Sequence, residues 1–221
     1  MEAYSVLYQF VRGPLFVVAV VVFLGGFIYQ VRGLLVAFKK DGAFRPYYNR
    51  RFALRSIYHW LIPYGTMSMR AQPFTTLASF LFHLSLFLIP IFLLAHNLLW
   101  YESLGISWWT LPEKVADVIT VIFLVAWLVL LLRRVAKPLP HFVTTVFDYL
   151  LLLGVLLPFL TGFLASHQWL LPYKLTVILH ILSAEVILMA LPFTRLMHMA
   201  YFFFTRAFMG SEFGFRGTRD W

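Results

Sequence analysis

Long apolar runs alternate with short polar segments along the whole chain. Five runs are long enough to cross a hydrocarbon core of about 30 Å, which takes about 20 residues of helix. They lie near Pro14–Phe38, Phe74–Trp100, Val115–Leu132, Phe142–Ser166 and Leu175–Phe204. The connections are short, and no repeat or low-complexity stretch interrupts the pattern. The sequence therefore predicts an all-α protein, a five-transmembrane-helix bundle that forms one integral membrane domain over residues 1–221.

The basic residues predict how this bundle is oriented. Fourteen of the eighteen lysines and arginines fall in the first and third connections and the C-terminal segment. The second and fourth connections hold only Lys114 and Lys174, together with aromatic residues that suit a membrane interface. The positive-inside rule then places the N-terminus outside and the C-terminus in the cytoplasm of a prokaryotic cytoplasmic (inner) membrane. The segment before the first run carries Glu2 and one base, so this run is expected to remain as a helix and not to be a cleaved signal.

The amino-acid composition excludes several kinds of site. Of the 221 residues, 62% are hydrophobic and 12% are charged, about half the charged share of soluble proteins. The absence of cysteine excludes disulfides, thiolate metal sites and covalent haem attachment. The net charge of +9 is explained by membrane orientation, so nucleic acid is not an expected partner. A docking face for a cytoplasmic subunit is the alternative use of the seven bases in the first connection.

Four of the seven histidines fall within the predicted membrane helices. His83 and His96 lie in the second helix, and His180 and His198 lie in the fifth. Polar side chains in hydrocarbon are costly and mark functional sites by default. Because the two helices run in opposite directions, His96 matches His180 in depth and His83 matches His198. Two imidazoles at one depth suit the axial positions of a haem iron, whereas hydrogen-bonded histidines without a cofactor are the alternative. The connections hold the other three, His59, His141 and His167, which are expected to be solvated.

The helical spacing supports this pairing only in part. His180 and His198 are 18 residues apart, which makes five whole turns and about 27 Å, so both rings leave one face. His83 and His96 are 13 residues apart, and their directions differ by about 140° in an ideal helix. Pro90 lies between them, and a kink or local rewinding there would bring the two rings to one face.

The run ILHILSAEVILMALPFTRLMH, which ends at His198, resembles a known family. It is similar to the fifth helix of the gamma subunits of respiratory nitrate reductases. That family includes related cytochrome b subunits of transmembrane redox complexes in sulfate-reducing prokaryotes. The resemblance implies a haem held by His83 with His198 near the cytoplasm and another held by His96 with His180 near the outer face. The long spacing in the second helix departs from the nitrate reductase pattern and favours the sulfate-reducer branch.

The resemblance implies electron transfer across the membrane, as a subunit of an oxidoreductase complex. Two haem b groups would connect a quinone pool, for which menaquinone is expected, to partner redox subunits. An iron–sulfur protein on the basic cytoplasmic face is the implied partner, and a periplasmic multihaem cytochrome c is the alternative.

Each ligating ring needs an acceptor for its second N–H. Candidates are Ser79 and Ser85 near His83, and Ser183 near His180.

The remaining candidates are charged residues near the predicted haems. Arg70 and Arg195 could pair with the haem propionates of the inner site, or anchor the helix ends at the interface. In the resembled family a lysine at the outer start of the third helix serves the quinone, and Lys114 occupies a similar place. Glu185 is an acid within an apolar helix and a candidate proton relay. Asp117 and Asp148 invite the same interpretation, unless they lie shallow enough to be solvated.

Three other functions compete with this interpretation. A cytochrome b subunit of the hydrogenase or formate dehydrogenase type would be expected to have four helices. A proton or metal-ion transporter would use the histidines and Glu185 without haem, but no internal symmetry accompanies them. A structural anchor would explain the basic face and leave the four histidines unexplained.

Overall fold

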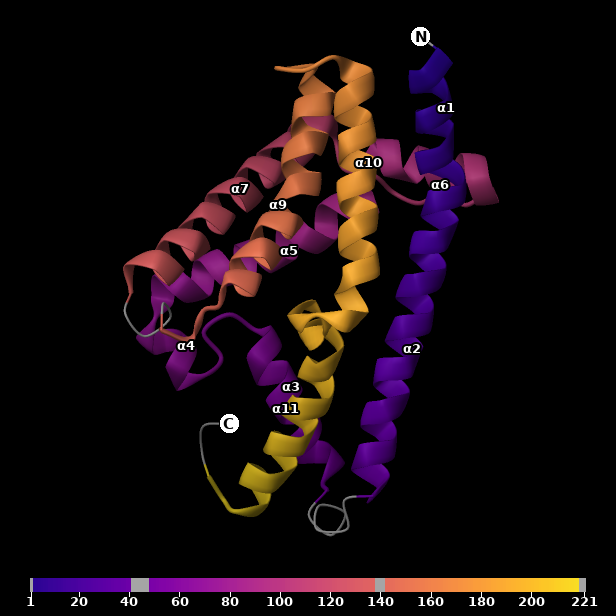
Figure 1. Ribbon diagram of the computed structural model, residues 1–221. Helices are drawn as coiled ribbons and strands as arrows, with labels where there is room; N and C mark the ends of the chain where they lie inside the picture. Colours follow the sequence, from indigo (N-terminus) through magenta and orange to yellow (C-terminus); the bar gives the residue numbers. More distant parts are fainter. Residues whose placement is uncertain (1, 41–47, 138–141, 219–221) are drawn as a thin grey trace. The chain divides into compact units, whose positions relative to one another are not determined.

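The computed structural model describes residues 2–40, 48–137 and 142–218, so Arg45, His141 and Arg219 lie outside the described residues. Within these ranges every regular element is a helix and no strand occurs (Figure 1). Five helices are long and apolar enough to cross a membrane: Tyr4–Lys40, Pro73–Phe92, Glu113–Ala136, Val146–His167 and Tyr173–Phe193. The predicted helical class and the five membrane helices are confirmed, and the chain is a multi-pass membrane protein.

The helical segment that contains the first membrane span begins at Glu2, twelve residues before the predicted start at Pro14. It comprises α1 (Glu2–Phe10), a π-helical turn η1 (Val11–Leu15) and α2 (Phe16–Lys40). Pro14 lies inside η1. A proline cannot donate a backbone hydrogen bond, and the wider π turn accommodates it without ending the helix.

Two of the predicted helices are interrupted. The second divides at Leu93 into α5 (Pro73–Phe92) and α6 (Leu94–Leu104). The fifth ends as α10 (Tyr173–Ala190), and two short 3-10 turns, η3 (Leu191–Phe193) and η4 (Arg195–Met197), precede α11 (His198–Phe215). Because Pro192 has no N–H and its ring clashes with the preceding turn, the α-helix cannot run on to Phe204 as predicted.

The other boundaries differ little from the prediction, and one region was not predicted to be helical. The third membrane helix is α7 (Glu113–Ala136) and the fourth is α9 (Val146–His167). The first connection, expected to be only a link, contains α3 (Arg50–Leu61) and α4 (Met67–Ala71). Asn49 caps the start of helix α3, because its side-chain oxygen accepts hydrogen bonds from two backbone N–H groups of the first turn.

The chain divides into two compact units, residues 73–180 and residues 1–72 with 181–221. The boundary falls within α10, and each unit is described by itself.

The first unit, residues 73–180, is built around aromatic rings from α5, α7 and α9. Phe123 of α7 has no exposed surface and packs between Phe82 and Phe159, with ring centroids 4.9 and 3.8 Å away. The indole N–H of Trp127 donates to the carbonyl of Leu152 at 2.9 Å, tying α7 to α9. These contacts hold α5, α7 and α9 together, and α5 carries His83.

Asp148 in this unit stabilises the start of α9. Its carboxylate accepts hydrogen bonds from the backbone N–H and the hydroxyl of Thr145, both at 2.8 Å. This is the geometry of a helix-capping residue. Asp148 therefore has a structural role here, and the proton-relay interpretation gains no support.

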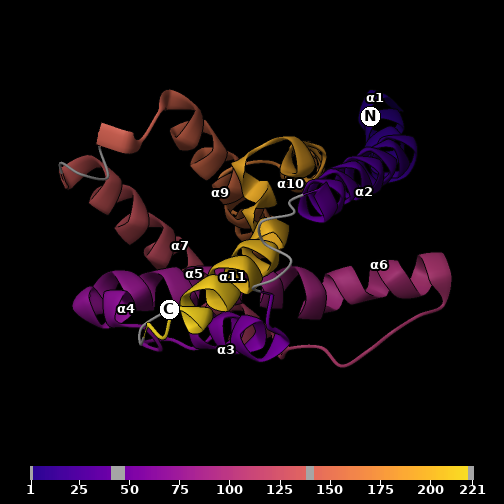
Figure 2. The same cartoon turned by 90° about the horizontal axis from the view of Figure 1, so that it is seen from below.

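In the second unit, α3 and α11 lie side by side (Figures 1 and 2). Gly210 and Gly214 face Ser56 and Phe52, and the guanidinium of Arg206 lies 4.0 Å from the ring centroid of Trp60. Helix α2 packs on η3 in the same unit, where Gln30 donates to the carbonyl of Pro192 at 3.0 Å. The two glycines permit the close approach of α3 and α11 because they present no side chain at the contact.

We expect Gly210→Ala to destabilise this pair of helices. A Cβ at this position would lie 2.8 Å from the carbonyl oxygen of Phe52 and would also meet the side chain of Ser56. Overpacking of this kind costs about 1–3 kcal/mol of unfolding free energy. Gly33→Ala in α2 is the matched control, since no atom lies within 4 Å of its Cβ. Thermal unfolding of both variants in detergent measures the difference, and equal stabilities would contradict this packing.

Candidate functional site

His96 of α6 and His180 of α10 form a matched pair within residues 73–180. Their ring planes lie within 8° of parallel, and their ring centroids are 6.0 Å apart. The two residues come from different helices, far apart in sequence. The structure thus brings together one of the two pairs that the sequence predicted from depth.

Backbone carbonyls orient both rings of this pair. Nδ1 of His96 lies 3.1 Å from the carbonyl oxygen of Pro90, and Nδ1 of His180 lies 2.8 Å from that of Pro158. A carbonyl oxygen can only accept a hydrogen bond, so Nδ1 carries the proton in each ring. In this tautomer Nε2 is the ring atom that can bind a metal ion, and the carbonyl fixes the orientation of each ring.

The break at Leu93 accounts for the unfavourable spacing in the second predicted helix. Leu93 is extended, with φ −71° and ψ 132°, so α6 starts in a new direction and the 140° offset of an ideal helix does not apply. An unbroken helix would use the carbonyl of Pro90 for the N–H of Leu94, whereas here it serves His96.

The connection between α6 and α7 forms hydrogen bonds with backbone carbonyls at the end of α5. The indole N–H of Trp108 donates to the carbonyl of Ile91, and the N–H of Leu111 donates to that of Phe92, both at 2.8 Å. These carbonyls would otherwise lack partners at the end of α5. The returning loop therefore stabilises the geometry that places His96.

Gly162 of α9 lies directly against the imidazole of His180. A Cβ at position 162 would lie 2.9 Å from Cε1 and 3.0 Å from Nδ1 of that ring. Any larger side chain would have to displace His180 or α9. The absence of a side chain at this position is thus a condition for the ring orientation.

The centroid separation of the pair can be compared with that of two imidazoles bound to one metal ion. A bond of about 2.0–2.1 Å to each nitrogen, plus about 1.1 Å from nitrogen to ring centre, gives a centroid separation of about 6.3 Å. The observed 6.0 Å is close to this value. Within the described ranges no group of three or more histidines and acids could hold a metal ion. Two axial nitrogens suit an iron whose other four ligands come from a tetrapyrrole, whereas a zinc site takes four protein ligands.

The rings of His83 and His198 are also oriented by backbone carbonyls. Nδ1 of His83 lies 2.7 Å from the carbonyl oxygen of Ser79, and Nδ1 of His198 lies 2.9 Å from that of Arg195. The predicted acceptor Ser79 is thus used through its carbonyl and not its hydroxyl. The two histidines belong to different compact units, so their pairing stays a prediction.

For His180 the acceptor differs from the predicted one. The bond to Pro158, which is 22 residues away in sequence, takes the place expected of Ser183. Ser85 is buried on α5. Nothing in the local pattern of α10 indicates that a carbonyl of α9 faces this histidine.

The predicted cationic residues lie at exposed positions. Arg70 donates from Nε to the carbonyl of Thr66 at 3.3 Å and from Nη2 to that of Gly65 at 3.4 Å, so it holds its own loop. Arg195 is exposed in η4 and supplies the carbonyl that accepts from His198. Lys114 is exposed in the first turn of α7. These positions agree with interface anchoring, and their roles toward haem or quinone stay predictions.

Glu185 is a buried acid within a membrane helix. It is 2% exposed on α10, and neither carboxylate oxygen has a hydrogen-bond partner among the described residues. An ionised carboxylate without partners in an apolar interior is strongly unfavourable. Glu185 therefore stays a candidate for proton exchange within the membrane.

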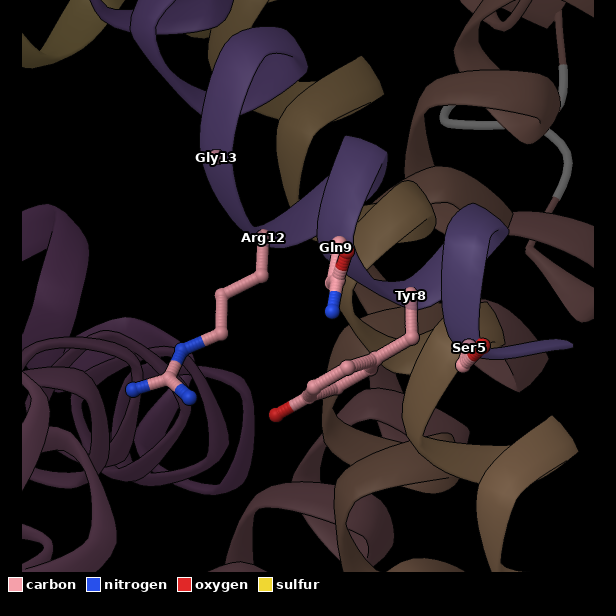
Figure 3. A pocket seen from close by; sticks show the side chains of 5 residues that line it. All are labelled: Ser5, Tyr8, Gln9, Arg12 and Gly13. Atoms are coloured by element: carbon pink, nitrogen blue, oxygen red, sulfur yellow. The ribbon is translucent and has the colours of Figure 1, made fainter. Parts of the chain in front are cut away.

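Two further features were not predicted. His167, expected to be solvated in a loop, ends α9, and its Nε2 lies 3.6 Å from a carboxylate oxygen of Asp117 on α7. An open depression on α1 and η1 is lined by Ser5, Tyr8, Gln9, Arg12 and Gly13 (Figure 3). This depression contains none of the predicted site residues.

Comparison with known proteins identifies one relationship. No family model and no solved structure matches the chain. A protein of Nitratidesulfovibrio vulgaris is 36% identical over 220 residues, which cover 95% of each chain. The chain therefore belongs to the same family as this Nitratidesulfovibrio vulgaris protein.

Proposed function

We propose that the chain is a di-haem b electron-transfer subunit of a respiratory redox complex in a prokaryotic cytoplasmic membrane. It passes electrons between a quinone pool, with menaquinone expected, and partner redox subunits. The observation that carries this proposal is the parallel pair of His96 and His180, 6.0 Å apart. The N-terminus is proposed to lie outside and the C-terminus in the cytoplasm.

The chain's residues suit the tasks that a protein performs around such a group. His96 and His180 would hold one haem through Nε2, since their Nδ1 atoms are used by the carbonyls of Pro90 and Pro158. When bound, a haem supplies reversible one-electron chemistry, while the protein sets its position and potential. The carbonyls increase the basicity of both ligands and prevent the rings from rotating.

The second haem is proposed between His83 and His198. Both have Nδ1 against a backbone carbonyl, so both offer Nε2 in the same tautomer as the first pair. Arg70 and Arg195 are proposed to pair with the propionates of this inner haem. Two haems are needed because a single one cannot reach both faces of a hydrocarbon core of about 30 Å.

The proposed partner is an iron–sulfur protein on the cytoplasmic side. Arg50, Arg51 and Arg55 are exposed on α3, and Lys39 and Lys40 end α2. This concentration of positive charge suits an acidic protein surface. A periplasmic multihaem cytochrome c is the second candidate for the exchange of electrons, at the opposite face.

Proton or metal-ion transport is the second candidate function. Glu185 favours proton movement, because a buried acid without a hydrogen-bond partner among the described residues can take up and release a proton within the membrane. In the haem-containing protein the same acid, with Lys114, is a candidate for proton exchange with quinone.

The experiment that decides between these functions is a haem assay of the purified full chain. A reduced-minus-oxidised spectrum and a pyridine haemochrome assay should give two non-covalent b haems per polypeptide. A folded chain without haem would exclude the cytochrome function and leave transport as the better account. One haem per chain would refute the proposal of two haems, and His180→Ala would then show whether the remaining haem is held by His96 with His180.

A further inference from the structure

Gln30 is a polar residue within the first membrane helix, and both ends of its amide are hydrogen-bonded. Its Nε2 donates to the carbonyl of Pro192 at 3.0 Å, and its Oε1 accepts from the hydroxyl of Tyr201 at 3.0 Å. A carbonyl can only accept a hydrogen bond, so the amide nitrogen faces Pro192 and the amide oxygen faces Tyr201. One side chain of α2 therefore holds two points that lie nine residues apart in the chain.

The segment between these two points contains His198. Pro192 precedes this histidine by six residues, and Tyr201 follows it by three, which is about one helical turn. Nδ1 of His198 lies 2.9 Å from the carbonyl of Arg195, so the ring is tied to the backbone of the same segment. Gln30 thus holds the chain on both sides of a predicted haem ligand.

The carbonyl of Pro192 accepts from Gln30 at the place where the fifth membrane helix is interrupted. In an unbroken α-helix this carbonyl would accept from the N–H of Leu196. Here that N–H donates to the side-chain oxygen of Thr194 at 3.3 Å, and the backbone of Thr194 is extended, with φ −126° and ψ 179°. A carbonyl without a partner is costly in an apolar interior, so the donor from α2 stabilises the interruption that precedes His198.

Gly26 permits the close approach of α2 to this interruption. It lies one turn before Gln30, and a Cβ there would be 2.7 Å from both Cγ of Pro192 and Cζ of Phe193. The packing of Gly26 and the hydrogen bonds of Gln30 therefore act on the same short segment. Polar side chains in membrane helices are costly and mark functional positions by default.

We propose that Gln30 and Tyr201 are positioning residues that hold His198 in the orientation in which it binds haem iron. This inference rests on the proposed function, which assigns His198 to the haem near the cytoplasm. The two residues act through the ligand and do not contact the iron. Fixing the start of α11 fixes the direction of the imidazole and its hydrogen bond to Arg195. The hydrogen bonding and orientation of an axial ligand help to set the potential of a haem iron.

The test is a redox titration of the purified, haem-loaded full chain, followed by optical absorbance and by electron paramagnetic resonance. Gln30→Leu removes both hydrogen bonds with little change in side-chain size. We expect it to change the ratio of ferric to ferrous affinity of one haem about tenfold, which shifts the midpoint potential of a one-electron couple by about 59 mV. The low-spin signal of this haem should shift as well, and it should be the haem that His198→Ala removes.

Tyr201→Phe removes a single hydroxyl and should shift the same haem by a smaller amount. If Gln30→Leu does not fold, this variant decides the result. Gln9→Leu in α1 and Tyr29→Phe in α2 are the matched controls, since both residues are exposed. Both controls should keep two haems at wild-type potentials.

Wild-type potentials and signals in folded Gln30→Leu and Tyr201→Phe would overturn the proposal, even if their thermal stability fell, because the hydrogen bonds would then serve packing alone. Equal shifts of both haems would overturn it as well. A wild-type chain without haem, or a chain from which His198→Ala removes none, would refute the proposed function at this site, and this inference with it.

Discussion

Replacing His180 with alanine should remove one haem of the two and leave the other in place. The proposed haem at this site would be held by His96 and His180, and the structure places these two rings in one parallel pair. With one ligand lost, the proposed haem keeps only one of its two bonds to the protein, and we expect its affinity to fall enough for it to be lost during purification. Pyridine haemochrome should therefore fall from two haems per chain to one, and His96→Ala should give the same value.

Double variants test which histidines share one haem. His96→Ala combined with His180→Ala should also retain one haem, because the two residues act as a unit. His83→Ala combined with His180→Ala should retain none, since each change removes a different haem. His59→Ala, outside both proposed sites, should retain two. If the double variant of His96 and His180 lost both haems while remaining folded, the assignment of ligands to pairs would be wrong.

Gly162→Ala should weaken the same haem without removing a ligand. The new Cβ would lie 2.9 Å from Cε1 of His180 and 3.0 Å from its Nδ1, so the ring would have to turn. Turning the ring also strains the hydrogen bond from Nδ1 to the carbonyl of Pro158. Loss of an outer partner of a metal ligand typically costs 10–100-fold in metal affinity. We expect partial loss of one haem, together with a shifted midpoint potential of the haem that remains at this site.

Gly25→Ala in α2 is the matched control for Gly162→Ala. No atom lies within 4 Å of a Cβ at position 25, so haem content and both potentials should stay unchanged. Redox titration of the purified variants measures both quantities. A Gly162→Ala variant with two haems at wild-type potentials would show that α9 does not constrain His180.

Much of the membrane architecture could be predicted from the sequence because it depends on local composition. A run of about 20 apolar residues is sufficient to define a membrane helix, and all five predicted helices are present. The interruptions at Leu93 and after Ala190 were harder to locate, although Pro90 and Pro192 lie near them. A proline shows that a helix is weakened, but neighbouring contacts decide where it breaks. Helix α3 was missed because a short amphipathic helix is stabilised by its packing on α11 and not by its own sequence.

The sequence by itself determined the class of the protein and the choice of His83, His96, His180 and His198 as candidate ligands. Opposed helix directions were enough to match His96 with His180 in depth. Only the tertiary structure decided how these rings are held. The contacts of His180 with Pro158 and Gly162, and of His167 with Asp117, join residues 18 to 50 positions apart. Helical periodicity relates residues three or four positions apart, so contacts between helices become visible only when the helices have packed.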